Sequence, residues 1–203
     1  MEEALLFGGA FNPVTVAHIH NAKYAMEKLS LSKVIFMPSK SSYILGEESK
    51  DFSFTEEERY QMLSIVAEKR PWMEVSDYEI RLDSQPRTYF TLKHLKKEGI
   101  QAKLLFGSDW LTNLKTKWRY VEEIGKEFSF VVMQRRNDDL KKKFDEDSYL
   151  KSLRPYFTFI DCPDEYQDVS STKVRKALKE RKYPEIEAMV PQEIQSYLER
   201  RFR

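Results

Sequence analysis

The sequence lacks several features that would place it in other classes of protein. Its one cysteine, Cys162, cannot form an internal disulfide, so a reducing compartment is expected. No apolar run approaches the roughly 18 residues of a membrane span, and Met-Glu-Glu leads into an apolar stretch without a signal-peptide pattern. These absences predict a cytoplasmic protein with no membrane partner.

A charge excess of one sign is also missing, because 34 Lys and Arg stand against 33 Asp and Glu. No overall positive field would attract nucleic acid, so we expect no nucleic-acid partner. Metal ligands are sparse: one cysteine supplies no zinc-binding pattern, and His18 and His20 would not face each other on a helix. We therefore expect no metal held by protein side chains.

The chain does have the composition and patterning of an α/β protein. Its 203 residues are 41% hydrophobic, which is enough for a core. Apolar strand-like stretches alternate with amphipathic helical ones, as in a parallel sheet with helices on both faces. The predicted strands lie at about 4–7, 34–37, 73–75, 103–106, 128–133 and 157–160, and the predicted helices at about 18–29, 55–67, 88–98, 171–181 and 191–201. We predict a Rossmann-like, doubly wound parallel sheet in a single domain over 1–203, with a small helical part from about 170 to 203.

Three local patterns refine this prediction. Thr55 and Glu58 have the spacing of a helix capping box. The polar stretch Ser39–Phe54 has no clear pattern and is expected to be a loop. The charged stretch 137–151 is expected to form a solvated helix or loop.

The first predicted strand runs into a turn and then a helix at Gly8-Gly9-Ala10-Phe11-Asn12-Pro13-Val14-Thr15-Val16-Ala17-His18. It is neither a Walker loop nor a G-x-G-x-x-G dinucleotide loop. A helix start leaves backbone N–H groups unpaired, and the two glycines have no side chains to keep a phosphate away from them. The stretch therefore predicts a phosphate site, against the plainer interpretation of a turn with a capping or packed histidine.

A second candidate phosphate site is Ser170-Ser171-Thr172-Lys173-Val174-Arg175. Hydroxyls and amides at a helix start can hold phosphate oxygens, and Arg175 lies one turn further on the same face. Its forked donors suit phosphate geometry. The alternative is a helix cap with an exposed arginine.

Both stretches resemble signatures of the nucleotidylyltransferase superfamily, Thr/His-x-Gly-His and Ser-Ser/Thr-Thr-x-x-Arg. The spelling Gly-Gly-x-Phe-Asn-Pro is most similar to the nicotinate-nucleotide adenylyltransferase family, and the resemblance runs from residue 4 to about residue 202. It implies transfer of the adenylyl group of ATP to nicotinate mononucleotide, giving deamido-NAD and pyrophosphate, with Mg²⁺ bridging the ATP phosphates. The implied partners are these small-molecule substrates, and a homo-oligomer is allowed.

The resemblance also assigns roles to individual residues. His18, Thr15 and Arg175 are the expected catalytic residues, with Thr15 and Arg175 at the pyrophosphate end. The expected ATP-binding residues are Gly8, Gly9, Ala10, Phe11, Ser170, Ser171, Thr172, Gly107, Asp109 and Arg136, or Arg135 in place of Arg136. The expected acceptor-binding residues are Thr88, Tyr89, Trp118 and Lys40. Because Gly107–Asp109 also follows a predicted strand, we expect it to meet the first loop at the carboxyl edge of the sheet.

Several departures from the family pattern leave alternatives open. Ala10 stands where the family has Ser or Thr, Ala17 replaces a glycine, and Met37-Pro38-Ser39-Lys40 replaces Pro-Pro-His-Lys, with Lys40 supplying the charge. Trp118 could stack on a pyridine ring or pack in the core, and Thr88 and Tyr89 could be a cap with packing. The alternative functions are adenylyl or cytidylyl transfer to nicotinamide mononucleotide or phosphopantetheine, and a non-catalytic nucleotide-binding regulator.

Overall fold

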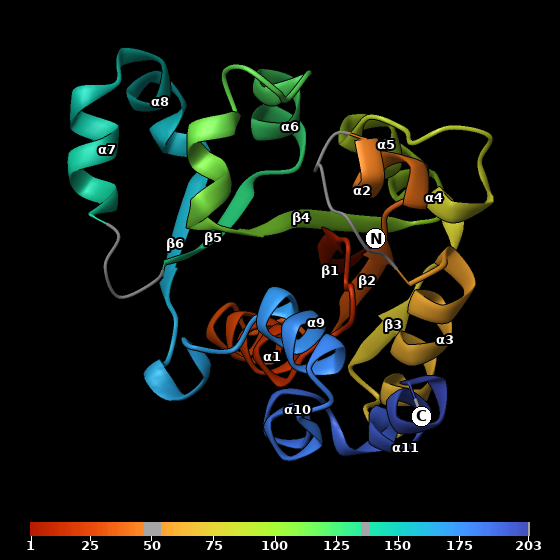
Figure 1. The fold of residues 1–203 in the computed structure, drawn as a ribbon. Coiled ribbons are helices and arrows are strands. Elements are labelled where there is room, and N and C mark those ends of the chain that lie inside the picture. The colour runs from red at the N-terminus through yellow and green to blue at the C-terminus, as the bar shows by residue number, and fades with distance from the viewer. Residues whose placement is uncertain (47–53, 135–138, 203) are drawn as a thin grey trace. The chain divides into compact units, whose positions relative to one another are not determined.

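The chain alternates strands and helices along its length (Figure 1). The structure is a computed structural model that describes residues 1–46, 54–134 and 139–202. The strands are β1 (Glu2–Gly9), β2 (Val34–Pro38), β3 (Met73–Val75), β4 (Ile100–Gly107), β5 (Phe130–Gln134) and β6 (Phe157–Asp161). The helices are α1 (Val16–Lys28), α2 (Ser41–Gly46), α3 (Glu56–Ala67), α4 (Tyr78–Arg81), α5 (Thr88–Lys97), α6 (Val121–Glu127), α7 (Leu140–Glu146), α8 (Ser148–Leu153), α9 (Ser171–Lys179), α10 (Tyr183–Met189) and α11 (Gln192–Phe202).

The strands form a six-stranded parallel sheet in the order β3-β2-β1-β4-β5-β6. Leu5 pairs with Lys103 and Leu105 with Val131, so β1, β4 and β5 run side by side in parallel. The predicted Rossmann-like α/β fold is therefore confirmed, as is the helical C-terminal part, which consists of α9, α10 and α11.

Contacts divide the described chain into two compact units, and each is taken by itself. The first unit comprises 1–7, 21–34 and 86–167, and the second comprises 8–20, 35–85 and 168–203. The predicted single domain over 1–203 stays a prediction.

In the first unit, an aromatic core lies along the parallel strands β4, β5 and β6. Phe130 stacks on Phe157 with ring centroids 4.6 Å apart, and the ring of Phe106 meets Phe130 edge-on. Phe144 on α7 meets Phe157 in the same way. Such ring pairs add about 0.5–1.5 kcal/mol each beyond the apolar area that they bury.

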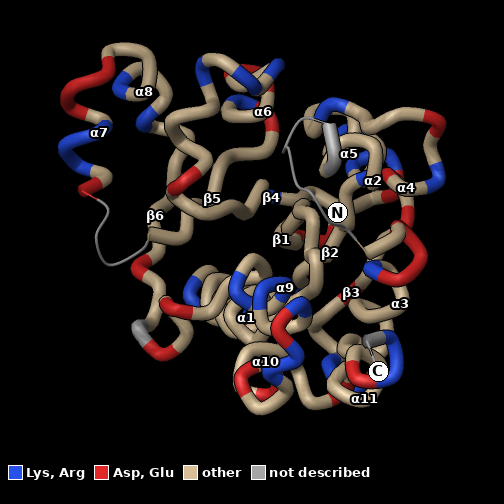
Figure 2. Tube along the Cα trace, viewed as in Figure 1, with Lys and Arg blue, Asp and Glu red and all other residues tan. Residues whose placement is uncertain are grey.

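In the second unit, α3 packs against β3 and α11, and α10 packs against α9 and α11 (Figure 1). The predicted capping box is confirmed: the Thr55 hydroxyl accepts a hydrogen bond from the Glu58 N–H, and the Glu58 carboxylate accepts one from the Thr55 N–H. Figure 2 shows acidic residues at the start of α3 and basic residues at the end of α11. Arg201 and Glu58 join these two helix ends at 2.7 Å.

The structure corrects several local expectations. Within the stretch Ser39–Phe54, where a loop was expected, the chain forms α2, whose Ile44 is buried. The stretch 137–151 is not merely solvated, because α7 and α8 bury apolar side chains against the core; these are Leu140, Phe144, Leu150 and Leu153. β5 begins at Phe130 rather than Phe128, because Ser129 has a left-handed backbone that no strand residue adopts. The helices α4, α6 and α10 were not predicted.

In the ranges that the structure describes, no helix is both long and apolar enough to cross a membrane.

Candidate active site

The loop between β1 and α1 is the centre of the site in the second unit. The five residues 11–15 are buried. Phe11 has a left-handed backbone conformation, with φ of 44°. The Asn12–Pro13 peptide bond is cis. A Cβ on Gly9 would lie 3.4 Å from the Phe11 ring, so this ring packs directly against the backbone at Gly9.

Two donors hold the start of this loop. The Gly9 carbonyl accepts a hydrogen bond from the Ser39 N–H at 2.9 Å, and the Ala10 carbonyl accepts one from Arg59 Nη1 at 2.8 Å. In a planar trans peptide the C=O and the following N–H point in opposite directions. The two tethers therefore turn the N–H groups of Ala10 and Phe11 away from Ser39 and Arg59.

The His18 ring is held by Thr15. His18 Nδ1 accepts a hydrogen bond from the Thr15 N–H at 3.0 Å and lies 2.8 Å from the Thr15 hydroxyl. Because Nδ1 accepts from a backbone amide, the proton of the neutral ring belongs on Nε2. The ring of Phe11 meets His18 edge-on at 5.3 Å and limits its tilt. Thr15 itself is completely buried, so in this arrangement its hydroxyl serves His18 rather than a ligand.

The first turn of α9 joins the same loop from 158 or more positions away in the sequence. Ser171 Oγ donates to the Pro13 carbonyl at 2.8 Å, across a separation of 158 residues. Arg175, which is 8% exposed, donates from Nη1 to the Asn12 carbonyl at 2.9 Å and from Nη2 to the Thr172 hydroxyl at 3.2 Å. The structure thus brings the two signature stretches together at the carbonyls of Asn12 and Pro13.

Ser170 and Thr172 differ in how they are used. Ser170 is the N-cap of α9, and its hydroxyl accepts a hydrogen bond from the Lys173 N–H at 3.2 Å. Thr172 is exposed apart from its contact with Arg175. In this turn Ser170 therefore caps the helix, and Thr172 holds the Arg175 side chain.

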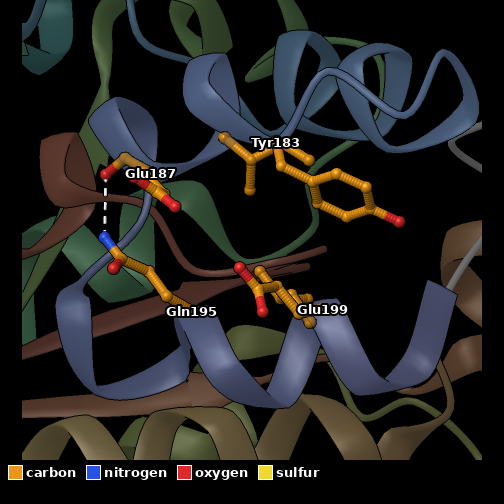
Figure 3. A pocket seen from close by; sticks show the side chains of 6 residues that line it. Tyr183, Glu187, Gln195 and Glu199 are labelled. Atoms are coloured by element: carbon orange, nitrogen blue, oxygen red, sulfur yellow. Dashed lines mark hydrogen bonds between the residues drawn. The ribbon is translucent and has the colours of Figure 1, made fainter. Parts of the chain in front are cut away.

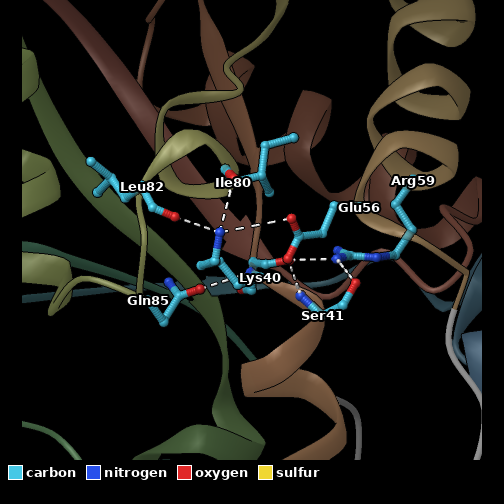
Figure 4. A network of polar contacts seen from close by, with 8 residues as sticks. Lys40, Ser41, Glu56, Arg59, Ile80, Leu82 and Gln85 are labelled. Carbon is cyan, nitrogen blue, oxygen red and sulfur yellow. Dashed lines mark hydrogen bonds and ion pairs between the residues drawn. The ribbon is translucent and has the colours of Figure 1, made fainter.

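Lys40 lies in a polar network of the second unit (Figure 4). Its ammonium donates to the carbonyls of Ile80 at 2.9 Å and Leu82 at 2.5 Å, and it lies 3.8 Å from the Glu56 carboxylate. The side chain is 12% exposed. Two of the three ammonium N–H donors thus bind carbonyls on either side of the end of α4, so Lys40 supports the chain there. Its expected role in acceptor binding stays a prediction.

The first unit carries the other residues expected around the nucleotide. Gly107 ends β4, and a Cβ there would lie 2.5 Å from Asp109 Oδ1, so only glycine lets the exposed Asp109 carboxylate fold back over the backbone. The half-buried Trp118 meets the rings of Phe106 at 5.4 Å and Trp110 at 6.3 Å. These contacts are compatible both with packing of Trp118 and with stacking of its exposed part on a ligand.

Tyr89 and Thr88 begin α5 in the same unit. The Tyr89 hydroxyl donates to Glu127 at 2.6 Å; this hydrogen bond raises the pKa of Tyr89 and lowers the pKa of Glu127. The Tyr89 ring stacks on Tyr120 at 5.3 Å. The N-cap is Arg87, so the alternative of Thr88 as the cap is wrong. The expected meeting of Gly107–Asp109 with the loop after β1 stays a prediction, and Arg135 and Arg136 lie outside the described residues.

Other candidate sites are poor. Among the described residues, no group of three or more His, Cys, Asp or Glu side chains could hold a metal ion. Figure 3 shows a cleft between α10 and α11, where Gln195 donates to the Glu187 carbonyl at 3.0 Å. Its cavity volume of about 10 Å³ is room for about one water molecule.

Sequence reasoning did not single out Arg59, or the side chain of Asn12, as parts of the site. Asn12 Oδ1 accepts a hydrogen bond from the Phe54 N–H at 2.9 Å. The available signals were weak: Asn12 belongs to the first signature, and Arg59 is a charged residue among the apolar positions of an otherwise well-marked helix.

Comparisons with known proteins show the family and the fold of the chain. The cytidylyltransferase-like family model matches residues 6–177. A Clostridium botulinum (strain Okra) protein named "probable nicotinate-nucleotide adenylyltransferase" is 32% identical over 200 residues, which cover 95% of this chain and 94% of that protein. A Caldicellulosiruptor bescii protein of the same name is 29% identical over 196 residues, covering 97% and 95%. The solved structure of Plasmodium falciparum nicotinic acid mononucleotide adenylyltransferase complexed with APC shares the fold, with a TM-score of 0.72, 19% identity and coverage of 100% of this chain and 99% of that one.

Proposed function

Because the chain belongs to the nicotinate-nucleotide adenylyltransferase family of cytidylyltransferase-like nucleotidyltransferases, we propose that it transfers the adenylyl group of ATP to nicotinate mononucleotide. The products are deamido-NAD and pyrophosphate. The single observation that carries the proposal is the junction of the two signatures, in which Arg175 and Ser171 bind the carbonyls of Asn12 and Pro13. A cap with an exposed arginine would not need this junction.

The chemistry asks the protein for positioning and charge rather than for a nucleophile. An oxygen of the mononucleotide phosphate attacks the α-phosphorus of ATP, and the bond from that phosphorus to the bridging oxygen breaks as pyrophosphate leaves. We assign His18 Nε2–H as a donor to the phosphate oxygens, where its bond strengthens as charge grows in the transition state. Thr15 acts through His18, by keeping Nδ1 as the acceptor and so the proton on Nε2.

The ATP side is completed by the other predicted residues. Arg175 and Thr172 serve the pyrophosphate end, and the backbone of Gly8–Phe11 and the start of α9 at Ser170 and Ser171 serve the phosphates. Gly107, Asp109 and Arg136, or Arg135, are assigned to the rest of the nucleotide by the family resemblance. Mg²⁺ would be held mainly by the ATP phosphates and water, with few or no protein ligands, and would supply charge that offsets that of the phosphates.

The acceptor side is assigned to Trp118, Thr88, Tyr89 and Lys40. Trp118 offers an indole face that suits a flat pyridine ring, which a linear acceptor such as phosphopantetheine would leave unused. Small-molecule substrates are thus the proposed partners. The cytoplasmic location, the absence of a nucleic-acid partner and a homo-oligomer stay predictions.

A pyrophosphate-release assay tests the proposal. ATP or CTP is combined with nicotinate mononucleotide, nicotinamide mononucleotide or phosphopantetheine, and the dinucleotide product is identified by mass spectrometry. The proposal expects the highest kcat/KM for ATP with nicotinate mononucleotide. Preference for another pair would reassign the substrate, and ATP binding without pyrophosphate release from any pair would indicate a regulator.

A further inference from the structure

Arg59 is a fully buried cation on α3, with no exposed surface. Its guanidinium makes hydrogen bonds from all three nitrogens: Nη1 to the Ala10 carbonyl at 2.8 Å, Nη2 to the Ser39 carbonyl at 2.6 Å, and Nε to the Phe54 carbonyl at 3.2 Å. A buried charge is costly unless it is well hydrogen-bonded. Here the cost of burying the charge is offset by three carbonyls, which belong to the loop after β1, the residue after β2 and the residue before the α3 cap. One side chain therefore fixes three backbone segments.

The segment before α3 holds the loop after β1 at a second point. The Phe54 N–H donates to Asn12 Oδ1, while the Phe54 carbonyl accepts from Arg59. Residues 10 and 12 are therefore both tied to the start of α3, one through its carbonyl and one through its side chain. The capping box of Thr55 and Glu58 in turn fixes the helix start from which Arg59 projects.

The network continues from Arg59 to Lys40 (Figure 4). Arg59 Nη2 also donates to Ser41 Oγ at 3.2 Å, and the Ser41 N–H donates to Glu56 Oε1 at 2.7 Å. The other oxygen of Glu56 pairs with Lys40. The backbone N–H of Lys40 donates to the Gln85 side chain at 2.8 Å. The same hydrogen-bond network therefore contacts both the segment after α4 and the loop after β1.

We propose that Arg59 is a positioning residue that aims the backbone amides of the phosphate-binding loop at ATP. By donating to the Ala10 carbonyl, it turns the Phe11 N–H the opposite way, away from the guanidinium, and the proposal takes that side to be the one that faces ATP. Its positive charge lies directly next to the Ala10 carbonyl, and its field favours an anion bound at the loop. This inference rests on the proposed adenylyl transfer, since the anion is taken to be the ATP phosphates.

The test compares Arg59→Met and Arg59→Lys with the control Arg70→Met. Arg70 is also a cation of the second unit, and it ties Glu193 at 2.9 Å and the Val66 carbonyl at 2.6 Å without touching the loop. Measured quantities are Tm, KM for ATP, KM for the pyridine mononucleotide, kcat, and the Kd of ATP by calorimetry. The calorimetric Kd keeps the test valid if the wild-type protein binds ATP without transferring it, which would overturn the proposed function alone.

We expect Arg59→Met to lower kcat/KM for ATP by about 10²-fold, the usual cost of misplacing a binding group by an ångström, and to change KM for the mononucleotide little. Arg59→Lys keeps the charge and one hydrogen bond, so it should recover part of the loss. Arg70→Met should lower Tm with wild-type kinetics. If Arg59→Met does not fold, a raised Kd for ATP in folded Arg59→Lys supports the proposal. Loss of Tm with an unchanged KM and Kd for ATP in either Arg59 variant overturns it.

Discussion

The loop after β1 and the aromatic surface around Tyr89 are held in different ways. In the loop, the carbonyls of Gly9, Ala10, Asn12 and Pro13 each accept a hydrogen bond from another segment, and the residues from Phe11 to Thr15 are buried. Around Tyr89 the contacts are mainly between rings, and Phe90 and Tyr120 are 50% and 40% exposed.

This difference separates a preorganised region from an adaptable one. Directional donors to fixed carbonyls leave little freedom, so removing one donor should misplace several atoms at once. Ring contacts contribute about 0.5–1.5 kcal/mol each and tolerate tilting. Substitutions should therefore act strongly in the loop and weakly on the aromatic surface.

The largest effect is expected for His18→Ala. Loss of one donor to the reacting phosphate should lower kcat by roughly 10²–10³-fold with the fold intact. Turnover is measured by pyrophosphate release, and circular dichroism checks the fold. His20→Ala is the matched control, because residues two apart on a helix do not share a face. Near wild-type turnover in His18→Ala would remove this ring from the mechanism.

Arg175→Ala should come next. We expect kcat/KM for ATP to fall by roughly 10–100-fold, since hydrogen bonds to charged groups contribute about 1.5–3 kcal/mol. Pyrophosphate binding in the reverse reaction should weaken in parallel. Lys176→Ala, at the exposed neighbouring position of α9, is the control. Unchanged kinetics in both directions would refute the assignment of Arg175 to the pyrophosphate end.

Trp118→Leu tests a second set of ring contacts in the first unit, those of Trp118 with Phe106 and Trp110. If the indole stacks on the pyridine ring, KM for nicotinate mononucleotide should rise by roughly 3–10-fold while KM for ATP stays the same. Trp72→Leu is the control, because Trp72 is also half-buried and meets an aromatic ring, that of Phe36, at 6.4 Å. Equal effects of both substitutions, or a larger change in KM for ATP, would favour plain packing of Trp118.

The same contrast explains what the sequence could predict. Apolar periodicity and capping spelling located the six strands and the start of α3, because these signals are local. The Ser39–Phe54 stretch was expected to be a loop because it has no clear pattern, and the short helix α2 within it was missed because serines also favour caps and turns. The two signatures were identified as phosphate sites, but the partners of their carbonyls were not. Arg59 and Lys40 each have partners 40 or more positions away, the Ala10 carbonyl for Arg59 and the Ile80 carbonyl for Lys40, and no local pattern encodes these contacts.

The smallest effect concerns a tether that lies outside the loop. Burial raises the pKa of Glu193, but the hydrogen bond from Arg70, a backbone hydrogen bond and the charges of Arg70 and Lys69 together outweigh it, so the pKa lies below the ordinary value of 4.5. A lowered folded-state pKa gives stability that is present above the unfolded-state pKa and lost as pH falls through the folded-state value. Glu193→Gln should therefore cost about 1 kcal/mol or less at pH 7, and this cost should shrink as the pH falls through the folded-state pKa. Urea denaturation of both proteins at pH 7 and pH 3 measures this difference. A stability gap that does not shrink between pH 7 and pH 3 would contradict this account of Glu193, and a changed KM for ATP at pH 7 would show that this tie also serves the loop.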